Sequence, residues 1–362
     1  MERITFIVKP VAAACNLRCR YCYNTMLWDD NAYCEKMSLE TLEFLIAQAA
    51  KLDLHKIDFI WHGGEPLLAG IAFYEEAYRL QLHYLKEKRF SNAFQSNGTL
   101  INDEWAYFAR QSHFTFGISL DGPEKINNYN RVFPSGEGSF QKIMKGVEIL
   151  RRQGIEPGAI AVITKKSIEK AQEIMDFFTK NKLYKLNLSA CAEKSRDQFN
   201  EFSITPSEWA QFMIEVFDRW IEDDNPDVKI QLLENLFQGL IGGKTTLCYC
   251  TKDCSSYVAV NSNGDLYLCG RFLGIEDFKL GNIAHTEISN ILTTDRYQHF
   301  VRETSIVKKE CRRCPWKLIC NGGCTYYRFI NGSIADHYYF CSSMKKLLSH
   351  MNFVIGGLKP AD

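Results

Sequence analysis

Short apolar runs alternate with amphipathic stretches through the first half of the 362-residue chain. The apolar runs have the length of strands, and they lie at residues 4–9, 57–61, 92–95, 114–119, 158–163 and 185–189. The stretches between them carry apolar residues at helical spacing, at residues 38–52, 73–87, 103–111, 139–153 and 167–180. Strands joined by helical crossovers predict a parallel sheet, and six such units predict an α/β fold with a partial (β/α)6 TIM-like barrel.

The pattern changes near residue 206. Two helices are predicted at 206–222 and 228–240, and a cysteine-rich region begins at Cys248. Inside that region, two short apolar runs flank Asn261-Ser-Asn-Gly-Asp265, which predicts a hairpin. We therefore expect a barrel over 1–204, a helical bridge over 205–244, a cysteine-rich domain over 245–345 and a tail over 346–362.

Polar motifs follow the predicted strands. A cysteine loop comes after the first strand, and His62-Gly63-Gly64-Glu65-Pro66 comes after the second. Asn97 and Asp121 come after the third and fourth. Parallel α/β folds bind ligands at the carboxyl ends of their strands, so these motifs predict one site.

The composition limits which partners and which redox compartment we expect. Lys+Arg and Asp+Glu both number 43, so the charge balance indicates neither nucleic acid nor an anionic membrane as a partner. The chain has no 18-residue apolar stretch and no export signal, so we expect a cytoplasmic protein. The 14 cysteines have metal-like spacings, which favours metal ligands over disulfides in such a compartment.

The loop motif Cys15-Asn-Leu-Arg-Cys19-Arg-Tyr-Cys22 has C-x3-C-x2-C spacing. Three thiolates can bind three irons of a [4Fe–4S] cluster, which leaves the fourth iron open to a substrate or cofactor. A zinc knuckle is the alternative for this motif.

A second array lies in the last third of the chain, with the spacings C-x9-G-x4-C and C-x2-C-x5-C-x3-C. Its eight cysteines are Cys248, Cys254, Cys269, Cys311, Cys314, Cys320, Cys324 and Cys341. Eight thiolates suffice for two fully ligated clusters, and tetrahedral zinc is again the alternative. Cys34, Cys191 and Cys250 are left over, and we interpret them as free thiols.

The loop motif resembles the signature of radical S-adenosylmethionine (SAM) enzymes, with Tyr21 in its aromatic position, and the second array is similar to the SPASM extension of such enzymes. The resemblance implies three [4Fe–4S] clusters and reductive cleavage of SAM to a 5′-deoxyadenosyl radical. It assigns Cys15, Cys19 and Cys22 to the SAM-binding cluster. The first auxiliary cluster would take Cys248, Cys254, Cys269 and Cys324, and the second Cys311, Cys314, Cys320 and Cys341. Cys250 could replace the neighbouring Cys248.

The same resemblance implies the contacts to SAM. Gly63, Gly64 and Glu65 would receive the methionine ammonium. Ser119 would bond the ribose, and Arg131 would meet the carboxylate. Tyr21 would lie against the adenine, and Asn97 would face the same SAM-binding end of the barrel.

Two groups of radical SAM/SPASM enzymes resemble the chain most: anaerobic sulfatase-maturing enzymes and peptide maturases. In the sulfatase group an aspartate follows the third cysteine of the first auxiliary cluster and acts as base, whereas Gly270 stands at that position here. We therefore expect a maturase that crosslinks a ribosomally made peptide, for example through a cyclophane or thioether. Formylglycine formation from Cys or Ser is the alternative, ahead of a small-molecule substrate and of a zinc-stabilised, non-enzymatic binding protein. The expected partners are a peptide or protein substrate and a reducing partner such as flavodoxin or ferredoxin.

Overall fold

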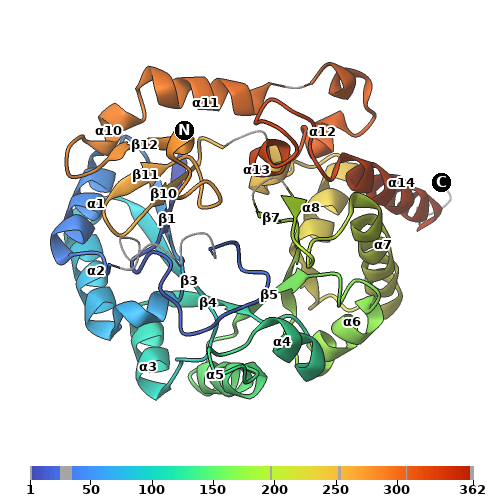
Figure 1. The fold of residues 1–362 in the computed structure, drawn as a ribbon, viewed down its shortest axis with the longest axis horizontal. Helices are drawn as coiled ribbons and strands as arrows, with labels where there is room; N and C mark the ends of the chain where they lie inside the picture. Colours follow the sequence, from blue (N-terminus) through green and yellow to red (C-terminus); the bar gives the residue numbers. More distant parts are fainter. Residues whose placement is uncertain (1, 25–34, 196–197, 252–253, 307, 359–362) are drawn as a thin grey trace. The chain divides into compact units, whose positions relative to one another are not determined.

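The computed structural model describes residues 2–24, 35–195, 198–251, 254–306 and 308–358 (Figure 1). Cys34 lies outside these residues. By its internal packing the chain divides into two parts, which interleave along the sequence. The first part comprises Met1–Ser119, Arg131–Pro157 and Cys254–Arg302, and the second part comprises Leu120–Asn130, Gly158–Asp253 and Glu303–Asp362.

The first part is built on a sheet whose parallel core confirms the first four expected strands. These are β1 (Arg3–Val8), β2 (Lys56–Trp61), β3 (Arg89–Ser96) and β4 (Phe114–Ser119), paired in that order. The helices that follow these strands also agree with the apolar pattern: α1 (Leu39–Lys51), α2 (Ile71–Tyr84), α3 (Asp103–Gln111) and α5 (Phe140–Arg152). Ser38 caps α1, because its Oγ accepts the Thr41 N–H at 3.0 Å.

A hairpin from the cysteine-rich region extends this sheet. Its strand β10 (Tyr257–Val260) runs parallel to β1, and β11 (Asp265–Tyr267) and β12 (Lys279–Asn282) follow in antiparallel order (Figure 1). The hairpin itself was expected, but its pairing with the N-terminal strand was not. Cys269, just after β11, is thereby carried on the same sheet as the cysteine loop after β1. The short elements η4 (Glu276–Phe278) and α10 (Ile288–Ile291) complete this region.

An aromatic cluster fixes the carboxyl end of β2. The Tyr74 ring meets Trp61 edge-on at 5.3 Å and Phe94 at 4.8 Å between ring centroids. The Tyr74 hydroxyl donates to the Pro66 carbonyl at 2.8 Å, at the start of η3 (Pro66–Ala69). Buried aromatic packing therefore holds the turn that carries Gly63, Gly64 and Glu65.

The second part contains the remaining parallel strands, β5 (Gly158–Ile163), β6 (Lys185–Ala190) and the two-residue β9 (Lys229–Ile230). Its longer helices were expected and are α6 (Ala171–Lys180), α7 (Pro206–Asp223) and α8 (Gln231–Leu240). Its shorter elements were not expected and are α4 (Glu124–Asn130), β7 (Lys194–Ser195), β8 (Gln198–Phe199), α9 (Cys248–Thr251), η5 (Lys309–Arg313), α12 (Lys317–Cys320) and α13 (Thr325–Phe329). The helices α14 (Cys341–Leu358) and α11 (Asp295–Ser305, which spans the boundary between the parts) were also not expected.

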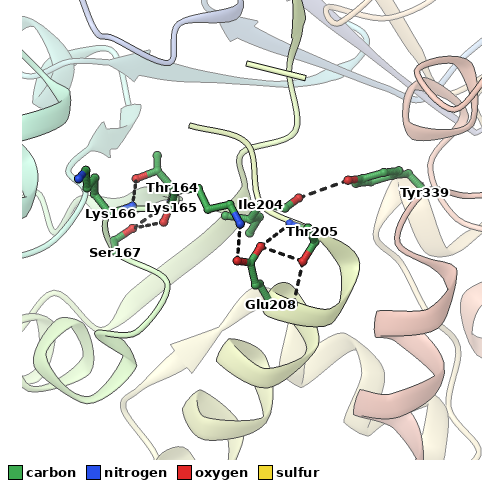
Figure 2. A network of polar contacts seen from close by, with 8 residues as sticks. All are labelled: Thr164, Lys165, Lys166, Ser167, Ile204, Thr205, Glu208 and Tyr339. Atoms are coloured by element: carbon green, nitrogen blue, oxygen red, sulfur yellow. Dashed lines mark hydrogen bonds and ion pairs between the residues drawn. The ribbon is translucent and has the colours of Figure 1, made fainter. Parts of the chain in front are cut away.

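The start of α7 shows how local sequence sets these boundaries. Thr205 and Glu208 form a capping box, and Lys165 pairs with the same carboxylate, Glu208 (Figure 2). Helix α6 begins at Ala171 rather than at the expected residue 167, because Ser167 closes a turn in which its Oγ accepts the Thr164 N–H at 2.9 Å. Among the described helices, none is both long and apolar enough to cross a membrane.

Candidate functional site

The cysteine loop after β1 lies entirely in the first part. Cys15, Cys19 and Cys22 carry thiols rather than disulfides, and all three are half-buried. The Leu17 N–H donates to Cys15 Sγ at 3.4 Å, and the Cys22 N–H donates to the Cys19 carbonyl at 3.1 Å, so the loop turns tightly. Three thiols on one tight turn fit a multi-iron cluster, which needs several thiolates from one side.

Two side chains from other segments direct N–H donors toward these sulfur atoms. Asn97 Nδ2 lies 3.7 Å from Cys15 Sγ, and Arg131 Nη1 lies 3.8 Å from Cys19 Sγ. Burial raises the pKa of Cys15 to about 11, and the Leu17 N–H and the Asn97 amide oppose that rise. Such a thiol ionises only when a cation stabilises it, which suits a metal ligand rather than a free nucleophile.

The Gly63–Gly64 turn lies directly on the cysteine loop. The Gly64 N–H donates to the Ala12 carbonyl and the Glu65 N–H to the Ala14 carbonyl, both at 2.8 Å. A Cβ on Gly64 would lie 1.9 Å from the Ala14 oxygen, and Gly63 has φ +114°. Only glycine permits this approach, so the two residues position the loop that ends in Cys15.

Glu65 joins this turn to the end of β3. Its buried carboxylate accepts from Leu67 N at 3.1 Å, Ser96 Oγ at 2.8 Å and Asn97 N at 2.7 Å. Burial raises the pKa of Glu65 to about 7, and these three donors oppose the rise. A bound ammonium group would favour the ionised carboxylate, which the sequence-based role of Glu65 requires.

Asn97 is fixed by a small polar ring that the sequence did not reveal. Its Nδ2 donates to Asn16 Oδ1 at 2.8 Å, and Asn16 Nδ2 donates to Thr99 Oγ1 at 2.8 Å. Thr99 Oγ1 closes the ring by donating to Asn97 Oδ1 at 2.7 Å. Asn97 therefore orients the cysteine loop from the end of β3.

Arg131 approaches the loop from the segment before α5. It is 6% exposed, and its guanidinium carbon lies 5.5 Å from the centroid of the Tyr21 ring. Its carbonyl accepts from Ser139 Oγ at 2.9 Å, and the next carbonyl, that of Val132, accepts the Arg18 N–H at 2.7 Å. The structure thus brings Arg131 and Tyr21 to the cysteines.

Ser119 lies at the end of β4 and is half-buried. It ends a strand of the same sheet that carries the cysteine loop, which is the position that the sequence predicts for a ribose contact.

A group of cations that sequence reasoning missed lies in the first part, between the cysteine loop and the region of Cys269. The Tyr23 ring has Lys9 Nζ 5.2 Å and the Arg271 guanidinium carbon 4.8 Å from its centroid. We call these three residues the Tyr23 stack. Lys9 is 1% exposed and donates to Asn24 Oδ1 at 3.2 Å. The sequence did contain a signal for this stack, because Lys9 ends the first predicted strand and Tyr23 directly follows the third cysteine of the loop.

Burial and neighbouring charges shift the pKa values of Lys9 and of the nearby His62. Burial lowers the pKa of Lys9 to about 8, while the charges of Cys22 and Cys269 act in the opposite direction. Burial and then the Lys9 charge lower the pKa of His62 to about 4, so His62 is neutral. Gly270 lies beside these residues in the sequence, and a Cβ there would lie 3.2 Å from Ile7 Cγ2.

Two aspartates near the motifs have local structural partners. The Asp121 carboxylate accepts from the Val162 N–H at 3.1 Å and from Asn130 Nδ2 at 3.2 Å within the second part. It is fully buried and braces the turn before α4, and its expected place beside the cysteine loop stays a prediction. Asp265 begins β11, and its carboxylate accepts from Asn282 Nδ2 at 2.8 Å and pairs with Lys279 at 2.9 Å, so its partners lie within the hairpin region.

Four cysteines of the second array surround one cavity of about 250 Å³ in the second part. Its lining includes Cys311, Cys314, Cys320 and Cys341. Burial raises the pKa of Cys320 to about 11 and also raises that of Cys341, where the Lys345 charge opposes it. In the described ranges, no three Cys, His, Asp or Glu side chains are close enough to hold a single metal ion, as tetrahedral zinc requires. The cavity instead has room for a larger metal–sulfide group.

The other cysteines of the array are divided between the two parts. Cys254 and Cys269 belong to the first, and Cys248 and Cys324 to the second, so their common ligation stays a prediction. Cys250 and Cys191 are buried and carry thiols rather than disulfides. Cys248 is half-buried, and the choice between Cys248 and Cys250 stays open.

Comparison with known proteins agrees with this geometry. The model of the radical SAM superfamily matches residues 10–178, and that of the SPASM iron–sulfur cluster-binding domain matches residues 248–315. The chain belongs to the radical SAM superfamily, in the group with a C-terminal SPASM domain that includes the anaerobic sulfatase-maturating enzymes.

Two curated relatives extend over most of the chain. A serine-type anaerobic sulfatase-maturating enzyme of Bacteroides thetaiotaomicron is 31% identical, over 89% of this chain and 83% of its own. A cysteine-type enzyme of Clostridium perfringens is 29% identical, over 97% of this chain and 96% of its own. The solved structure of native anSMEcpe with bound AdoMet and Cp18Cys peptide superposes with a TM-score of 0.88 and 26% identity, covering 99% of this chain and 100% of that one.

These comparisons confirm the expected class. The protein has the α/β radical SAM fold followed by a cysteine-rich SPASM domain, and it is a radical SAM oxidoreductase that uses SAM and [4Fe–4S] clusters. The alternative of a zinc-stabilised, non-enzymatic protein is therefore wrong. The relatives are sulfatase-maturating enzymes, so they support formylglycine formation better than the crosslink that the sequence led us to expect first.

Proposed function

We propose that this enzyme oxidises a cysteine or serine side chain of a peptide or protein substrate to formylglycine. The observation that carries the proposal is the near-full-length similarity to both serine-type and cysteine-type sulfatase-maturating enzymes. One solved relative holds AdoMet and a peptide together. The crosslink expected from the sequence becomes the second candidate.

In this proposal the cysteine loop holds the SAM-binding cluster through Cys15, Cys19 and Cys22. When bound, the cluster and SAM supply a 5′-deoxyadenosyl radical, which takes a hydrogen atom from the substrate Cβ. The amide of Asn97 and the guanidinium of Arg131 stabilise the thiolates by donating to sulfur, at 3.7 and 3.8 Å.

The neighbouring residues orient SAM. Glu65 in its ionised form accepts from the methionine ammonium, beside the open backbone of Gly63 and Gly64. Arg131 pairs with the methionine carboxylate, since a guanidinium presents a planar fork of donors.

Two further residues would hold the nucleoside. Ser119 bonds the ribose from the end of β4, and the ring of Tyr21 lies against the adenine. Tyr21 is 7% exposed, so its ring is already fixed before SAM arrives.

The overall reaction consumes no net electron. A substrate CH2–SH or CH2–OH group loses two hydrogens, SAM becomes methionine and 5′-deoxyadenosine, and one proton is released. The thioaldehyde formed from cysteine then exchanges sulfur for oxygen from water and releases hydrogen sulfide. The electron used to cleave SAM is returned by the substrate radical.

A specific observation keeps the crosslink as the second candidate. Gly270 offers no carboxylate where the sulfatase group carries its base, and the Tyr23 stack surrounds the region with positive charge. If the enzyme makes formylglycine, Lys9 is the group we assign to accept the proton from its deprotonated fraction, which burial enlarges by lowering its pKa to about 8.

The test uses the reconstituted enzyme, dithionite and SAM with matched peptides that contain Cys, Ser or Ala at the target position. Formylglycine, trapped as a hydrazone and sequenced by tandem mass spectrometry, is the expected product from the Cys or Ser peptide. Loss of two hydrogens without an aldehyde would establish the crosslink instead. The variant with Cys15, Cys19 and Cys22 changed to Ala is the control and must yield neither product nor 5′-deoxyadenosine.

A further inference from the structure

A short loop over residues 320–324 connects the two groups of cysteines in the second part. In the sequence-based assignment, Cys320 at its start binds the second auxiliary cluster and Cys324 at its end binds the first. The three residues between them are all left-handed, with φ of +50° at Asn321, +87° at Gly322 and +71° at Gly323. Consecutive left-handed residues do not persist by themselves, so surrounding contacts must hold this loop.

Arg328 on α13 supplies one set of these contacts. Its guanidinium donates to four backbone carbonyls: Nε to Gly322 at 2.9 Å, Nη1 to Thr304 at 3.3 Å, and Nη2 to Gly323 at 3.4 Å and Asn321 at 3.5 Å. A Cβ on Gly322 would lie 2.6 Å from Nη2. The guanidinium therefore lies directly on the 320–324 loop.

Other contacts hold the same loop. Asn321 Nδ2 donates to the Cys250 carbonyl at 2.6 Å. The Tyr338 ring lies against Gly323, where a Cβ would be 2.2 Å from the ring carbon Cγ. The loop is thus supported without Arg328 as well, so the hydrogen bonds of Arg328 do not by themselves explain why a charged side chain is buried here.

The charge of Arg328 has no compensating charge in the protein. The side chain is 1% exposed, and its four acceptors are neutral carbonyls. Among the residues that the structure describes, no Asp or Glu carboxylate forms an ion pair with Arg328. A guanidinium cannot lose its proton, and burying an isolated charge is costly. The buried charge therefore calls for an anion close by.

The cysteines at the two ends of the loop identify that anion. Cys320 and Cys324 flank the three loop carbonyls that Arg328 binds. A [4Fe–4S] group bound by four thiolates carries net negative charge, and each auxiliary cluster takes one ligand from this loop in the sequence-based assignment. One buried cation thus lies next to a ligand of each cluster.

We propose that Arg328 is a positioning residue that acts as the shared counter-cation of both auxiliary clusters and raises both reduction potentials. A cluster gains one negative charge when it accepts an electron, so a nearby cation stabilises the reduced form more than the oxidised form. Loss of the cation should therefore shift both potentials in the negative direction. The proposal rests on the two clusters and not on which substrate side chain is oxidised.

The test measures reduction potentials by redox titration followed by electron paramagnetic resonance. It uses reconstituted protein in which Cys15, Cys19 and Cys22 are changed to Ala, so that only the auxiliary clusters titrate. Arg328→Gln removes the charge, and we expect the oxidised-to-reduced ratio of both clusters at a fixed potential to rise by about tenfold. That ratio corresponds to potentials about 59 mV more negative.

Arg328→Lys separates charge from shape. Lysine keeps the positive charge but lacks the planar fork that reaches several carbonyls, so a merely structural role would be lost in both variants. We expect the ratio in Arg328→Lys to stay within about twofold of the unsubstituted protein.

Arg219→Gln is the matched control, because it removes the same charge elsewhere in the second part. Arg219 on α7 pairs with Asp223 at 2.7 Å and with Asp176 at 3.0 Å, so carboxylates already balance its charge. The potentials of both clusters should change less than about twofold in the same ratio.

Unchanged potentials in Arg328→Gln, an equal shift in Arg328→Lys, or a shift confined to one cluster would overturn the proposal. Iron analysis decides the case in which a variant cannot hold its clusters. Loss of up to about eight irons from Arg328→Gln but not from Arg328→Lys would support a role of the charge, whereas the same loss from both would assign Arg328 a role of shape alone. Potentials and iron content do not depend on formylglycine formation, so a failure of the proposed function leaves this test intact.

Discussion

At the scale of single residues, the site depends on side chains that act on the cysteine loop without being ligands. Asn97, Arg131 and Glu65 come from three segments and meet at the loop through defined hydrogen bonds. Their effects are electrostatic, because Asn97 and Arg131 direct donors at Cys15 and Cys19, and the Glu65 charge adds to the burial that raises the pKa of Cys15. Changes of charge at constant size therefore test these residues most directly.

Glu65 predicts a pH dependence. Its folded pKa, about 7, is above the ordinary value of 4.5, so it contributes stability that is present below about pH 4.5 and is lost as pH rises through 7. Ligand-free wild-type protein should therefore lose up to roughly 3 kcal/mol of this contribution between pH 5 and pH 8. Urea unfolding of the wild type and Glu65→Gln at several pH values measures it.

The opposite trend is expected when SAM binds. Ionised Glu65 attracts the methionine ammonium, so SAM affinity should rise between pH 6 and pH 8 in the wild type and stay flat in Glu65→Gln. A SAM affinity with the same pH dependence in both proteins would remove Glu65 from the binding site.

Asn97 predicts a redox effect. Asn97→Asp replaces the donor to Cys15 Sγ and Asn16 Oδ1 by a carboxylate, which repels both. We expect a loss of about 1–3 kcal/mol of stability and a more negative reduction potential for the SAM-binding cluster. Titration followed by electron paramagnetic resonance measures the potential. Thr99→Val is the control, because it breaks the polar ring but keeps the Asn97 donor, and it should leave the potential nearer to the wild type.

At the scale of elements, the site is a contact between loops that follow neighbouring parallel strands. The loops after β1 and β2 share backbone hydrogen bonds of 2.8 Å, and the β10–β11 hairpin brings the Cys269 region alongside β1. Parallel strands place their carboxyl ends at one edge, so loops that are distant in sequence become neighbours.

Gly64 tests this contact. In Gly64→Ala the new Cβ would lie 1.9 Å from the Ala14 oxygen, so the cysteine loop must shift. We expect more than about 3 kcal/mol of destabilisation and loss of iron from the first cluster. Gly356→Ala in α14 is the control, because no atom lies within 4 Å of its new Cβ, and it should stabilise the protein by about 0.5–1 kcal/mol. Full iron content in Gly64→Ala would show that the turn does not position the loop.

At the scale of the whole molecule, three clusters should be separable by mutation. Wild-type holoenzyme should contain about twelve irons, from three [4Fe–4S] clusters. The triple variant of Cys15, Cys19 and Cys22 should lose about four irons and all SAM cleavage, whereas Cys314→Ala should lose up to about four irons but retain SAM binding. Iron and sulfide analysis with a SAM-binding assay checks both. Cys191→Ala, at a buried cysteine outside both arrays, should keep every iron.

The sequence by itself determined the elements and the chemical class of this protein. Apolar periodicity depends on neighbouring residues, so β1 to β6, α1 to α3 and α5 to α8 largely agree with the expected ranges. Capping residues such as Ser38 and Thr205 also act locally. The cysteine spacings also lie within short segments, so they indicated the radical SAM and SPASM motifs directly. The sequence also showed Gly270 at the position where the sulfatase group carries an aspartate. The relatives do not support the crosslink that we inferred from this difference.

Only the tertiary structure decided which side chains meet. The Asn16–Asn97–Thr99 ring, the Tyr23 stack and the pairing of β10 with β1 join residues that are far apart in the sequence. Asp121 has the same motif position as Asn97, but its carboxylate accepts from the Val162 N–H and from Asn130 Nδ2. Periodicity encodes the face of an element and not its partners, so the cavity lined by four cysteines could be identified only from the folded chain.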